Sequence, residues 1–179
     1  MNPFAKVNLP FDRRYATTEL CRGDQITKST GTVYPFKMNR AYMVFKPAVF
    51  KALDADDIHW CEVQTHIAPH IDIVATVRLN VYTVVNGGVT SFYTEKQNSK
   101  PTMAAYRQAQ MLRVPSIYNP GDLEYQCSFV AKKFDVYVLD TKVVHDVSHG
   151  EGHRSYIQLT WKTTPFSVIL NRLKDLINV

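Results

Sequence analysis

Apolar and polar residues alternate along most of the chain from residue 58 onward, which is the pattern of β-strands with one buried face. We expect strands at Ile58–Ile67, Ile71–Val85, Val89–Tyr93, Leu123–Ala131, Asp135–Leu139, Val143–Val147 and Arg154–Trp161. Asn86-Gly87-Gly88 lies between two of these segments and predicts a tight turn, because glycine adopts the positive φ that such turns require.

Two other segments have the spacing of helices. Lys46–Leu53 predicts a short helix with its proline in the first turn, where proline is tolerated. Pro165–Val179 places its apolar residues on one stripe and predicts an amphipathic helix. Residues 1–32 predict irregular structure or short edge strands, whereas Thr32–Phe45 should contain a strand. Residues 94–120 are polar, and connections of this length often act as lids or substrate loops.

The order of these elements predicts the fold class. About eight short strands framed by a few helices indicate a mostly β protein, with a jelly-roll core rather than a parallel α/β sheet. We expect residues 1–179 to form a single domain, since this length can bury a substantial core. Within it, residues 58–162 would form the jelly roll, 1–57 an N-terminal extension with a short helix, and 165–179 the C-terminal helix.

Composition adds expectations about the cellular setting. A hydrophobic fraction of 45% and a charged fraction of 21% are ordinary for a soluble globular protein. No apolar run approaches 18 residues and the N-terminus has no apolar signal region, so we expect neither a membrane span nor secretion. The scattered cysteines Cys21, Cys61 and Cys127 favour reduced thiols and a cytoplasmic location. The net charge of +5 is dispersed and indicates solvated surface rather than a nucleic-acid patch.

The motif His70-Ile71-Asp72 is the first candidate for chemistry. Side chains alternate along a strand, so His70 and Asp72 would point to one face, about 6–7 Å apart, and Ile71 and Ile73 to the opposite one. Together with a second histidine they would form the 2-His-1-carboxylate set that binds Fe(II) and leaves coordination positions open. Such a short motif matches often by chance, so other residues must support it.

The third ligand would come from His59, His66, His145, His149 or His153. A lone histidine is more often structural, but His145 ends a strand-like run, and Arg154 opens the next strand nine residues later. That spacing would place Arg154 deeper in the same interior, where a guanidinium can hold a carboxylate with two parallel hydrogen bonds. His149 and His153 lie in a glycine-rich loop that would fix ligand geometry poorly.

Two of the expected strands have one polar face and one apolar face. The polar faces carry Arg78, Asn80 and Tyr82 on one strand and Arg154, Tyr156, Gln158 and Thr160 on the other. These faces could simply be exposed to solvent, as in many antiparallel sheets. Alternatively they line the interior of a barrel whose outer faces are covered by helices. The amphipathic C-terminal helix needs an apolar surface to cover and so favours the barrel.

Four segments together resemble the Fe(II)/2-oxoglutarate-dependent oxygenases: H-I-D, N-G-G-V-T-S-F-Y, F-D-V-Y-V-L-D-T-x-x-V-H-D-V and R-S-Y. The similarity spans about residues 58–162 and is greatest to the prolyl hydroxylase and aspartyl/asparaginyl β-hydroxylase branches. It implies a double-stranded β-helix (jelly-roll, cupin-like) core. It also implies that His70, Asp72 and His145 bind Fe(II), and that Arg154 holds the distal carboxylate of 2-oxoglutarate.

The same resemblance implies further roles and a reaction. Tyr82 would assist Arg154. Asn80 and Tyr156 share the polar strand faces of Tyr82 and Arg154, and from that position we expect them to line the co-substrate site. With O2 as the second co-substrate, the enzyme would hydroxylate a C–H bond and release succinate and CO2. One departure is Phe134, which stands before Asp135 where the family usually has glycine.

The substrate class stays open. A peptide or protein side chain is the analogy from the nearest branches, and such an analogy rests on fold alone. A free amino acid or a nucleobase is an alternative, although the second arginine typical of the nucleic-acid branch has only Arg172 as a counterpart. Two other classes are a jelly-roll module that binds without catalysis and a cupin-type metalloenzyme with another co-substrate, which would not need Arg154.

Overall fold

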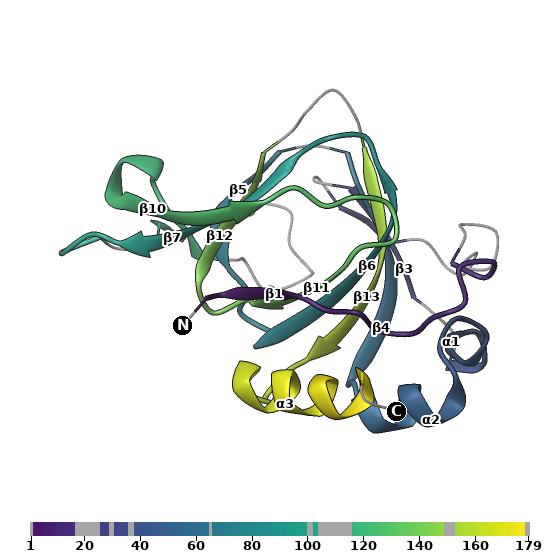
Figure 1. Cartoon of the computed structure of the whole chain (residues 1–179). Helices are drawn as coiled ribbons and strands as arrows, with labels where there is room; N and C mark the ends of the chain where they lie inside the picture. The colour runs from purple at the N-terminus through teal and green to yellow at the C-terminus, as the bar shows by residue number, and fades with distance from the viewer. Residues whose placement is uncertain are drawn as a thin grey trace.

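The chain folds into two antiparallel β-sheets that face each other, with helices on the outer side of one of them (Figure 1). The computed structural model describes residues 2–16, 26–28, 31–35, 38–64, 66–99, 102–103, 116–148 and 153–177. The mostly β fold class expected from the alternating pattern is therefore confirmed.

The described strands form one seven-stranded and one six-stranded sheet. The larger has the order β1 (Phe4–Lys6), β11 (Val136–Asp140), β6 (Val77–Val85), β13 (Arg154–Trp161), β4 (Asp57–Val63), β3 (Gly31–Pro35) and β2 (Ile26–Lys28). The smaller has the order β10 (Leu123–Phe129), β7 (Val89–Glu95), β12 (Val144–Ser148), β5 (Ile67–Ile71), β9 (Ser116–Ile117) and β8 (Thr102–Met103). The helices are α1 (Met38–Val44), α2 (Pro47–Leu53), α3 (Phe166–Ile177) and the 3-10 turn η2 (Pro120–Asp122).

The strand pairing is that of a double-stranded β-helix. β4 pairs with β13 and β6 with β11 in the larger sheet, while β5 pairs with β12 and β7 with β10 in the smaller. The pairs are thus nested along the chain and alternate between the two sheets, as in a jelly roll. The turn after β6 carries the chain from one sheet to the other, and Gly87 and Gly88 have φ of 98° and 90° there.

The strand boundaries correct two expectations. The continuous strand expected at Ile71–Val85 is wrong: β5 ends at Ile71, residues 72–76 cross between the sheets, and β6 begins at Val77. The segment Thr32–Phe45 contains β3, as expected, but also helix α1, which the pattern did not predict. Helices α2 and α3 and the short edge strands β1 and β2 agree with the predictions, whereas residues 104–115 of the polar connection lie outside the described residues.

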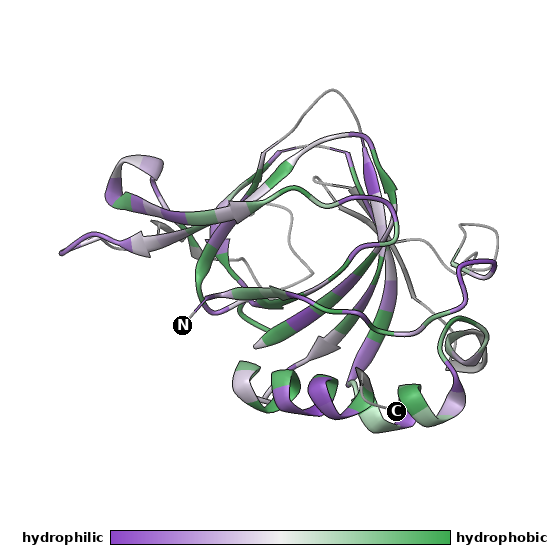
Figure 2. Ribbon diagram, in the orientation of Figure 1, coloured by the Kyte–Doolittle hydropathy of each residue, from purple (hydrophilic) through white to green (hydrophobic). Residues whose placement is uncertain are grey.

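The main apolar core lies between the outer face of the larger sheet and the helices. Apolar and polar residues alternate along the strands beside α3 (Figure 2), and the apolar ones meet the helices. Its members include Leu79, Val81, Ile157, Leu159, Phe50, Leu53, Ile169 and Leu173. The Trp161 indole N–H donates to the carbonyl oxygen of Leu53 at 3.0 Å, which ties β13 to the end of α2.

The space between the sheets is divided into an aromatic end and a polar end. Tyr82, Phe92, Phe129 and Tyr137 form a cluster in which the rings of Phe129 and Tyr137 stack at 3.9 Å. The polar faces of β6 and β13 also point inward, so Asn80, Arg154 and Gln158 are buried. The barrel interpretation is confirmed, and the solvent-exposed alternative is wrong.

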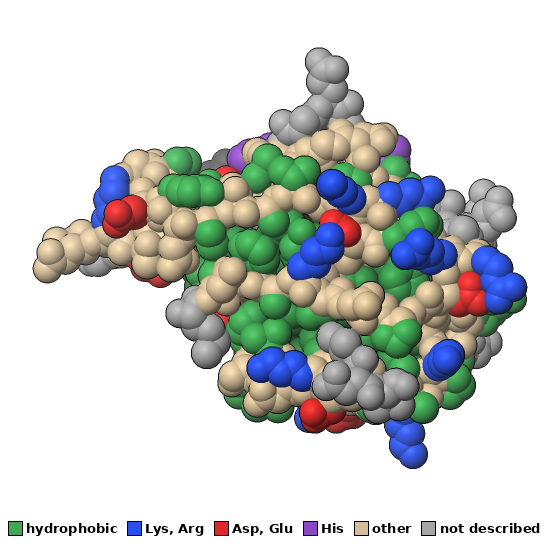
Figure 3. Space-filling model, in the orientation of Figure 1, with side chains coloured by type: hydrophobic (Ala, Val, Ile, Leu, Met, Phe, Trp, Pro, Cys, Tyr) green, Lys and Arg blue, Asp and Glu red, His purple; other side chains and the backbone are tan. Residues whose placement is uncertain are grey.

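The outer surface is mixed in charge. On the face shown in Figure 3, lysine and arginine side chains spread across the surface, with acidic side chains beside some of them. Ion pairs of the described residues include Lys6–Asp135 and Lys162–Asp57. Within the described residues, no helix has the length and apolar character needed to cross a bilayer.

Candidate active site

His70 and His145 are direct neighbours across the smaller sheet. β5 and β12 pair in antiparallel register with these two residues opposite each other. Their imidazole centroids lie 4.4 Å apart with the rings tilted by 47°, and both side chains are buried. The fold therefore brings together the two histidines that the sequence proposed as ligands.

Both rings are held by backbone carbonyls in the same way. Nδ1 of His70 lies 2.8 Å from the oxygen of Ala68, and Nδ1 of His145 lies 2.9 Å from the oxygen of Val143. A carbonyl oxygen only accepts hydrogen bonds, so Nδ1 carries the proton in each ring and Nε2 keeps its lone pair. This is the arrangement by which proteins orient histidines for metal ligation.

Burial also sets the protonation state of the two rings. Desolvation lowers the pKa of His70 below its ordinary value. Desolvation, together with the nearby His70, lowers the pKa of His145 to about 4. Both imidazoles are therefore neutral near neutral pH, which is the form that binds metals.

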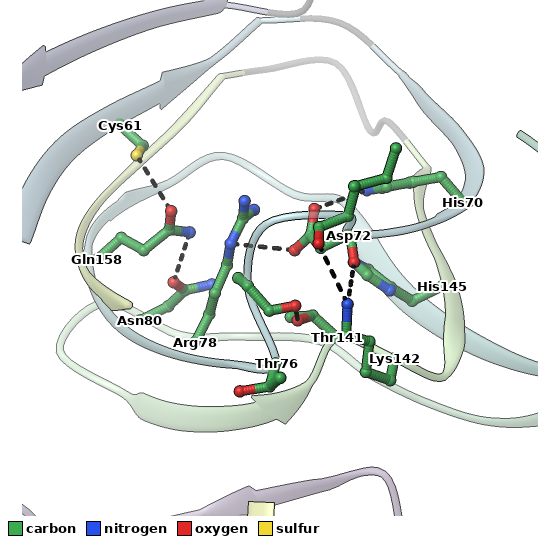
Figure 4. A network of polar contacts seen from close by, with 12 residues as sticks. Cys61, His70, Asp72, Thr76, Arg78, Asn80, Thr141, Lys142, His145 and Gln158 are labelled. Carbon is green, nitrogen blue, oxygen red and sulfur yellow. Dashed lines mark hydrogen bonds and ion pairs between the residues drawn. The ribbon is translucent and has the colours of Figure 1, made fainter. Parts of the chain in front are cut away.

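Asp72 lies immediately after β5, with Oδ1 3.8 Å from Nε2 of His70 (Figure 4). Burial raises the pKa of the Asp72 carboxyl, but the electrostatic effects of Arg78, His145, His70 and Lys142 together lower it by more. The net pKa of Asp72 is therefore below the ordinary value. The carboxylate is therefore ionised beside the two neutral imidazoles.

The main chain of Asp72 is fixed although it lies outside the strand. Its N–H donates to the oxygen of Thr141 at 3.0 Å, and its carbonyl accepts from Nζ of Lys142 at 2.8 Å. The strand alternation used in the sequence argument does not extend to this position, and Ile73 is 47% exposed rather than buried on an apolar face. Contacts with the turn between β11 and β12 place Asp72 instead.

The Asp72 carboxylate has a partner that the sequence argument missed. Nε of Arg78 lies 3.0 Å from Oδ2, closer than the histidine, although the pair makes no well-directed hydrogen bond. In the part of the chain that the structure describes, no group of three or more His, Cys, Asp and Glu side chains is already arranged around a metal position. His70 is thus a neighbour of both His145 and Asp72, while the Asp72 carboxylate is paired with Arg78.

Arg154 opens β13 and is buried, with 3% of its surface exposed. One guanidinium nitrogen, Nη1, donates to Oγ1 of Thr90 at 3.1 Å. The other terminal nitrogen, Nη2, is buried and has no hydrogen-bond partner among the described residues. Such a group is costly unless a ligand or water satisfies it, so Nη2 is available to donate to either.

One cavity connects these groups. It holds about 430 Å³ of empty space, its open mouth included. Its lining includes His70, His145, Arg154, Tyr82, Asn80, Tyr156, Arg78, Thr90 and Gln158. All the site residues proposed from the sequence thus line the cavity except Asp72. Asp72 is instead a neighbour of two lining residues, His70 and Arg78.

The far wall of the cavity is a fixed polar network. Sγ of Cys61 donates to Oε1 of Gln158 at 3.9 Å, and Nε2 of Gln158 donates to Oδ1 of Asn80 at 3.1 Å (Figure 4). The amide nitrogen of Asn80 therefore remains as a donor. Burial raises the pKa of Tyr156, whose ring lies 5.4 Å from that of Tyr82, so its hydroxyl stays protonated.

The other histidine candidates that the structure describes are not at this site. His66 and His153 are exposed, and His59 does not line the cavity. His149 lies outside the described residues. The one signal for Arg78 in the sequence was its place on the same polar strand face as Asn80.

Comparison with known proteins gives only distant likenesses. No protein-family model and no curated protein matches the chain. HygX from Streptomyces hygroscopicus, solved with nickel and 2-oxoglutarate bound, is 12% identical, with coverage of 87% of this chain and 81% of HygX and a TM-score of 0.49. The ycfD protein of E. coli is 11% identical over 83% of this chain and 38% of its own, with a TM-score of 0.48.

An oxalate decarboxylase is also 12% identical, over 79% of this chain, with a lower TM-score of 0.39. The chain spans only 29% of that protein's length. Likeness at these identities says nothing about activity.

Proposed function

We propose that this protein is an oxygenase that uses Fe(II), 2-oxoglutarate and O2 to hydroxylate a C–H bond. The observation that carries the proposal is the composition of one cavity. Two neutral imidazoles with free Nε2 lone pairs meet beside an ionised carboxylate, and a buried guanidinium with an unpartnered nitrogen lines the same cavity.

His70, Asp72 and His145 would hold the metal, since two imidazoles and one carboxylate are the donor set that suits non-haem Fe(II). When bound, Fe(II) would supply open coordination positions and redox chemistry for a reaction in which one oxygen atom of O2 oxidises 2-oxoglutarate to succinate and CO2 and the other hydroxylates the substrate C–H bond. The carbonyls of Ala68 and Val143 orient the two rings, and burial excludes bulk water.

Arg154 would bind the distal carboxylate of 2-oxoglutarate. Its Nη2 lacks a partner, while the bond from Nη1 to Thr90 fixes the plane of the guanidinium. The hydroxyl of Tyr156, the ring of Tyr82 and the amide nitrogen of Asn80 line the same cavity and would position the co-substrate. Tyr82 and Tyr156 provide the apolar walls that such a carbon chain needs.

For the substrate we propose a peptide or protein side chain. A free amino acid or a nucleobase is the alternative within the same reaction type. Turnover with each class, measured as succinate formed above the uncoupled background, distinguishes them.

A second candidate function follows from the Arg78–Asp72 ion pair. Because Arg78 already neutralises the carboxylate, the cavity could bind an organic anion at Arg154 without a metal or a reaction. This would be a jelly-roll binding module. It predicts 2-oxoglutarate binding that does not depend on a divalent metal.

Calorimetric titration tests the two candidates. Mn(II), which does not support turnover, is titrated first, and 2-oxoglutarate is then titrated into the metal-loaded and metal-free protein. The oxygenase requires Mn(II) binding that His145→Ala abolishes, and 2-oxoglutarate binding that Mn(II) strengthens. Equal 2-oxoglutarate affinity with and without metal would favour the binding module, and no binding of either ligand would contradict both.

A further inference from the structure

Arg78 occupies an unusual place for a cavity arginine. It projects from β6 into the cavity that His70, His145 and Arg154 also line. Its Nε lies 3.0 Å from Oδ2 of Asp72, whereas Nε2 of His70 lies 3.8 Å from Oδ1. The guanidinium therefore lies on Oδ2 and offsets the charge of the carboxylate, whose other oxygen, Oδ1, faces His70.

The contact is close but incompletely satisfied. Both Nε of Arg78 and Oδ2 of Asp72 are buried without a directed hydrogen bond, so each atom retains capacity for another partner. The Arg78 side chain is 29% exposed, whereas Arg154 is buried and bonded to Thr90. Of the two cavity arginines, Arg78 is therefore the more accessible to solvent.

A metal ion and Arg78 compete for the same carboxylate. Both carry positive charge, so a metal on Asp72 would also repel a guanidinium at this distance. The main chain of Asp72 is held by Thr141 and Lys142, so the exchange involves side-chain rotation alone. An anion in the cavity would give the displaced guanidinium a new partner.

This inference rests on the metal site proposed above. We propose that Arg78 is a positioning residue that holds Asp72 while no metal is bound, and that an anion entering the cavity draws Arg78 away and releases the carboxylate to the metal. Metal and anion therefore bind cooperatively, and by linkage each raises the affinity for the other by the same factor.

The test measures Mn(II) affinity by electron paramagnetic resonance, with and without saturating succinate, a dicarboxylate without the chelating keto group. In the wild type, succinate should tighten Mn(II) binding about 10-fold. In Arg78→Gln, Mn(II) should bind about 10-fold more tightly without succinate, and succinate should add less than about 2-fold. Arg78→Met keeps the aliphatic stem and should behave alike, so the test stands if Arg78→Gln does not fold.

Lys142→Gln is the matched electrostatic control. Lys142 also lies beside Asp72, but its Nζ contacts the carbonyl oxygens of Asp72 and Ile73 rather than the carboxylate. Lys142→Gln should keep the full succinate effect. If it loses that effect as Arg78→Gln does, general electrostatics explains the result and the positioning role is wrong.

The remaining outcomes separate this inference from the proposed function. If wild type and Arg78→Gln bind Mn(II) equally and respond equally to succinate, the role of Arg78 is contradicted while the metal site stands. If neither binds Mn(II), the metal site itself is contradicted, and this inference with it. If Arg78→Gln binds Mn(II) and the wild type binds only with succinate, both are supported.

Discussion

Arg154 and Arg78 enter one cavity from neighbouring strands, yet their surroundings give them different roles. Arg154 is buried, its Nη1 is bonded to Thr90, and its Nη2 has no partner. Arg78 is partly exposed and paired with Asp72. The residue type is the same, and the neighbours leave one guanidinium with a nitrogen available to a ligand while the other is paired with a carboxylate.

The first prediction concerns Arg154→Ala. It should weaken 2-oxoglutarate binding by about 2–5 kcal/mol, because it removes a buried, hydrogen-bonded charge partner. Arg154→Lys should be intermediate, since it keeps the charge but loses the planar fork. Calorimetric titration of 2-oxoglutarate into Mn(II)-loaded protein measures both variants. Mn(II) affinity should not change, and wild-type 2-oxoglutarate affinity in Arg154→Ala would remove the arginine from the site.

The backbone at Gly88 lies close to the Arg154 guanidinium. Its φ is +90°, and a Cβ at this position would lie 2.9 Å from the carbonyl oxygen of Ser148 and 3.6 Å from Cζ of Arg154. Glycine is thus required both by the backbone angle and by the contact.

We predict that Gly88→Ala lowers the free energy of unfolding by about 1–3 kcal/mol, the cost of a strained backbone conformation. Urea denaturation measures it. Gly121→Ala is the control, because the nearest atom to a Cβ there is Oδ1 of Asn119 at 3.6 Å, an ordinary contact. Equal stability of the two variants would show that residues 87–88 relax without cost.

The backbone at Phe134 gives a reason for the residue that stands where the oxygenases that the sequence resembles usually have glycine. It precedes β11 with φ of 71°, in the left-handed region where glycine is the ordinary residue. Its ring packs 6.2 Å from that of Phe11 and lies 5.1 Å from the Arg13 guanidinium. The turn therefore keeps the backbone conformation that glycine would provide and offsets its cost with ring contacts.

At the scale of elements, a β-bulge on β6 brings Tyr82 opposite Tyr156 in the cavity wall. Between Ser155 and Tyr156 the register with β6 shifts, so that Tyr156 lies opposite Tyr82 and Thr83 is the extra residue. The Thr83 hydroxyl donates to the oxygen of Ser155 at 2.9 Å, which stabilises the bulge. Bulges of this kind re-aim side chains beside functional sites.

Helix α3 covers the outer face of the larger sheet. Phe166, Ile169 and Leu173 are buried there, whereas Val168 is 39% exposed. We predict that Leu173→Ala lowers the free energy of unfolding by about 2–5 kcal/mol, as for other buried leucines. Val168→Ala should change it by less than about 0.5 kcal/mol. Urea denaturation compares the two, and an unaffected Leu173→Ala protein would mean that α3 does not stabilise the sheet.

At the scale of the whole molecule, the site joins the two sheets. His70 and His145 come from the smaller sheet, and Arg78 and Arg154 from the larger. A ligand that contacts both sets therefore binds only the folded jelly roll, and its binding free energy adds to global stability.

We predict that Mn(II) at 100 times its dissociation constant raises stability by about 2.7 kcal/mol. For a chain of this size that corresponds to a rise in Tm of about 5–11 °C. Thermal denaturation followed by circular dichroism measures the shift. His145→Ala should lose it, and a wild-type Tm that Mn(II) leaves unchanged even in the presence of succinate would count against the metal site.

The sequence by itself determined the elements whose burial pattern is local. The period of two from Ile58 onward predicted the core strands, and the helical stripe in Pro165–Val179 predicted α3. It also predicted that the polar faces of β6 and β13 line an interior, because an amphipathic helix and an apolar strand face must cover each other. Residue order alone was enough to select His145 and Arg154 as candidates.

The tertiary structure alone decided how distant segments meet. The apolar pattern runs through residues 71–85 without a break, so it could not reveal that the chain leaves one sheet at Ile71 and enters the other at Val77. For the same reason it could not reveal that Asp72 is placed by Thr141 and Lys142, or that Arg78 holds its carboxylate. These contacts join residues far apart in sequence, and alternation along one strand contains no information about what lies across the fold.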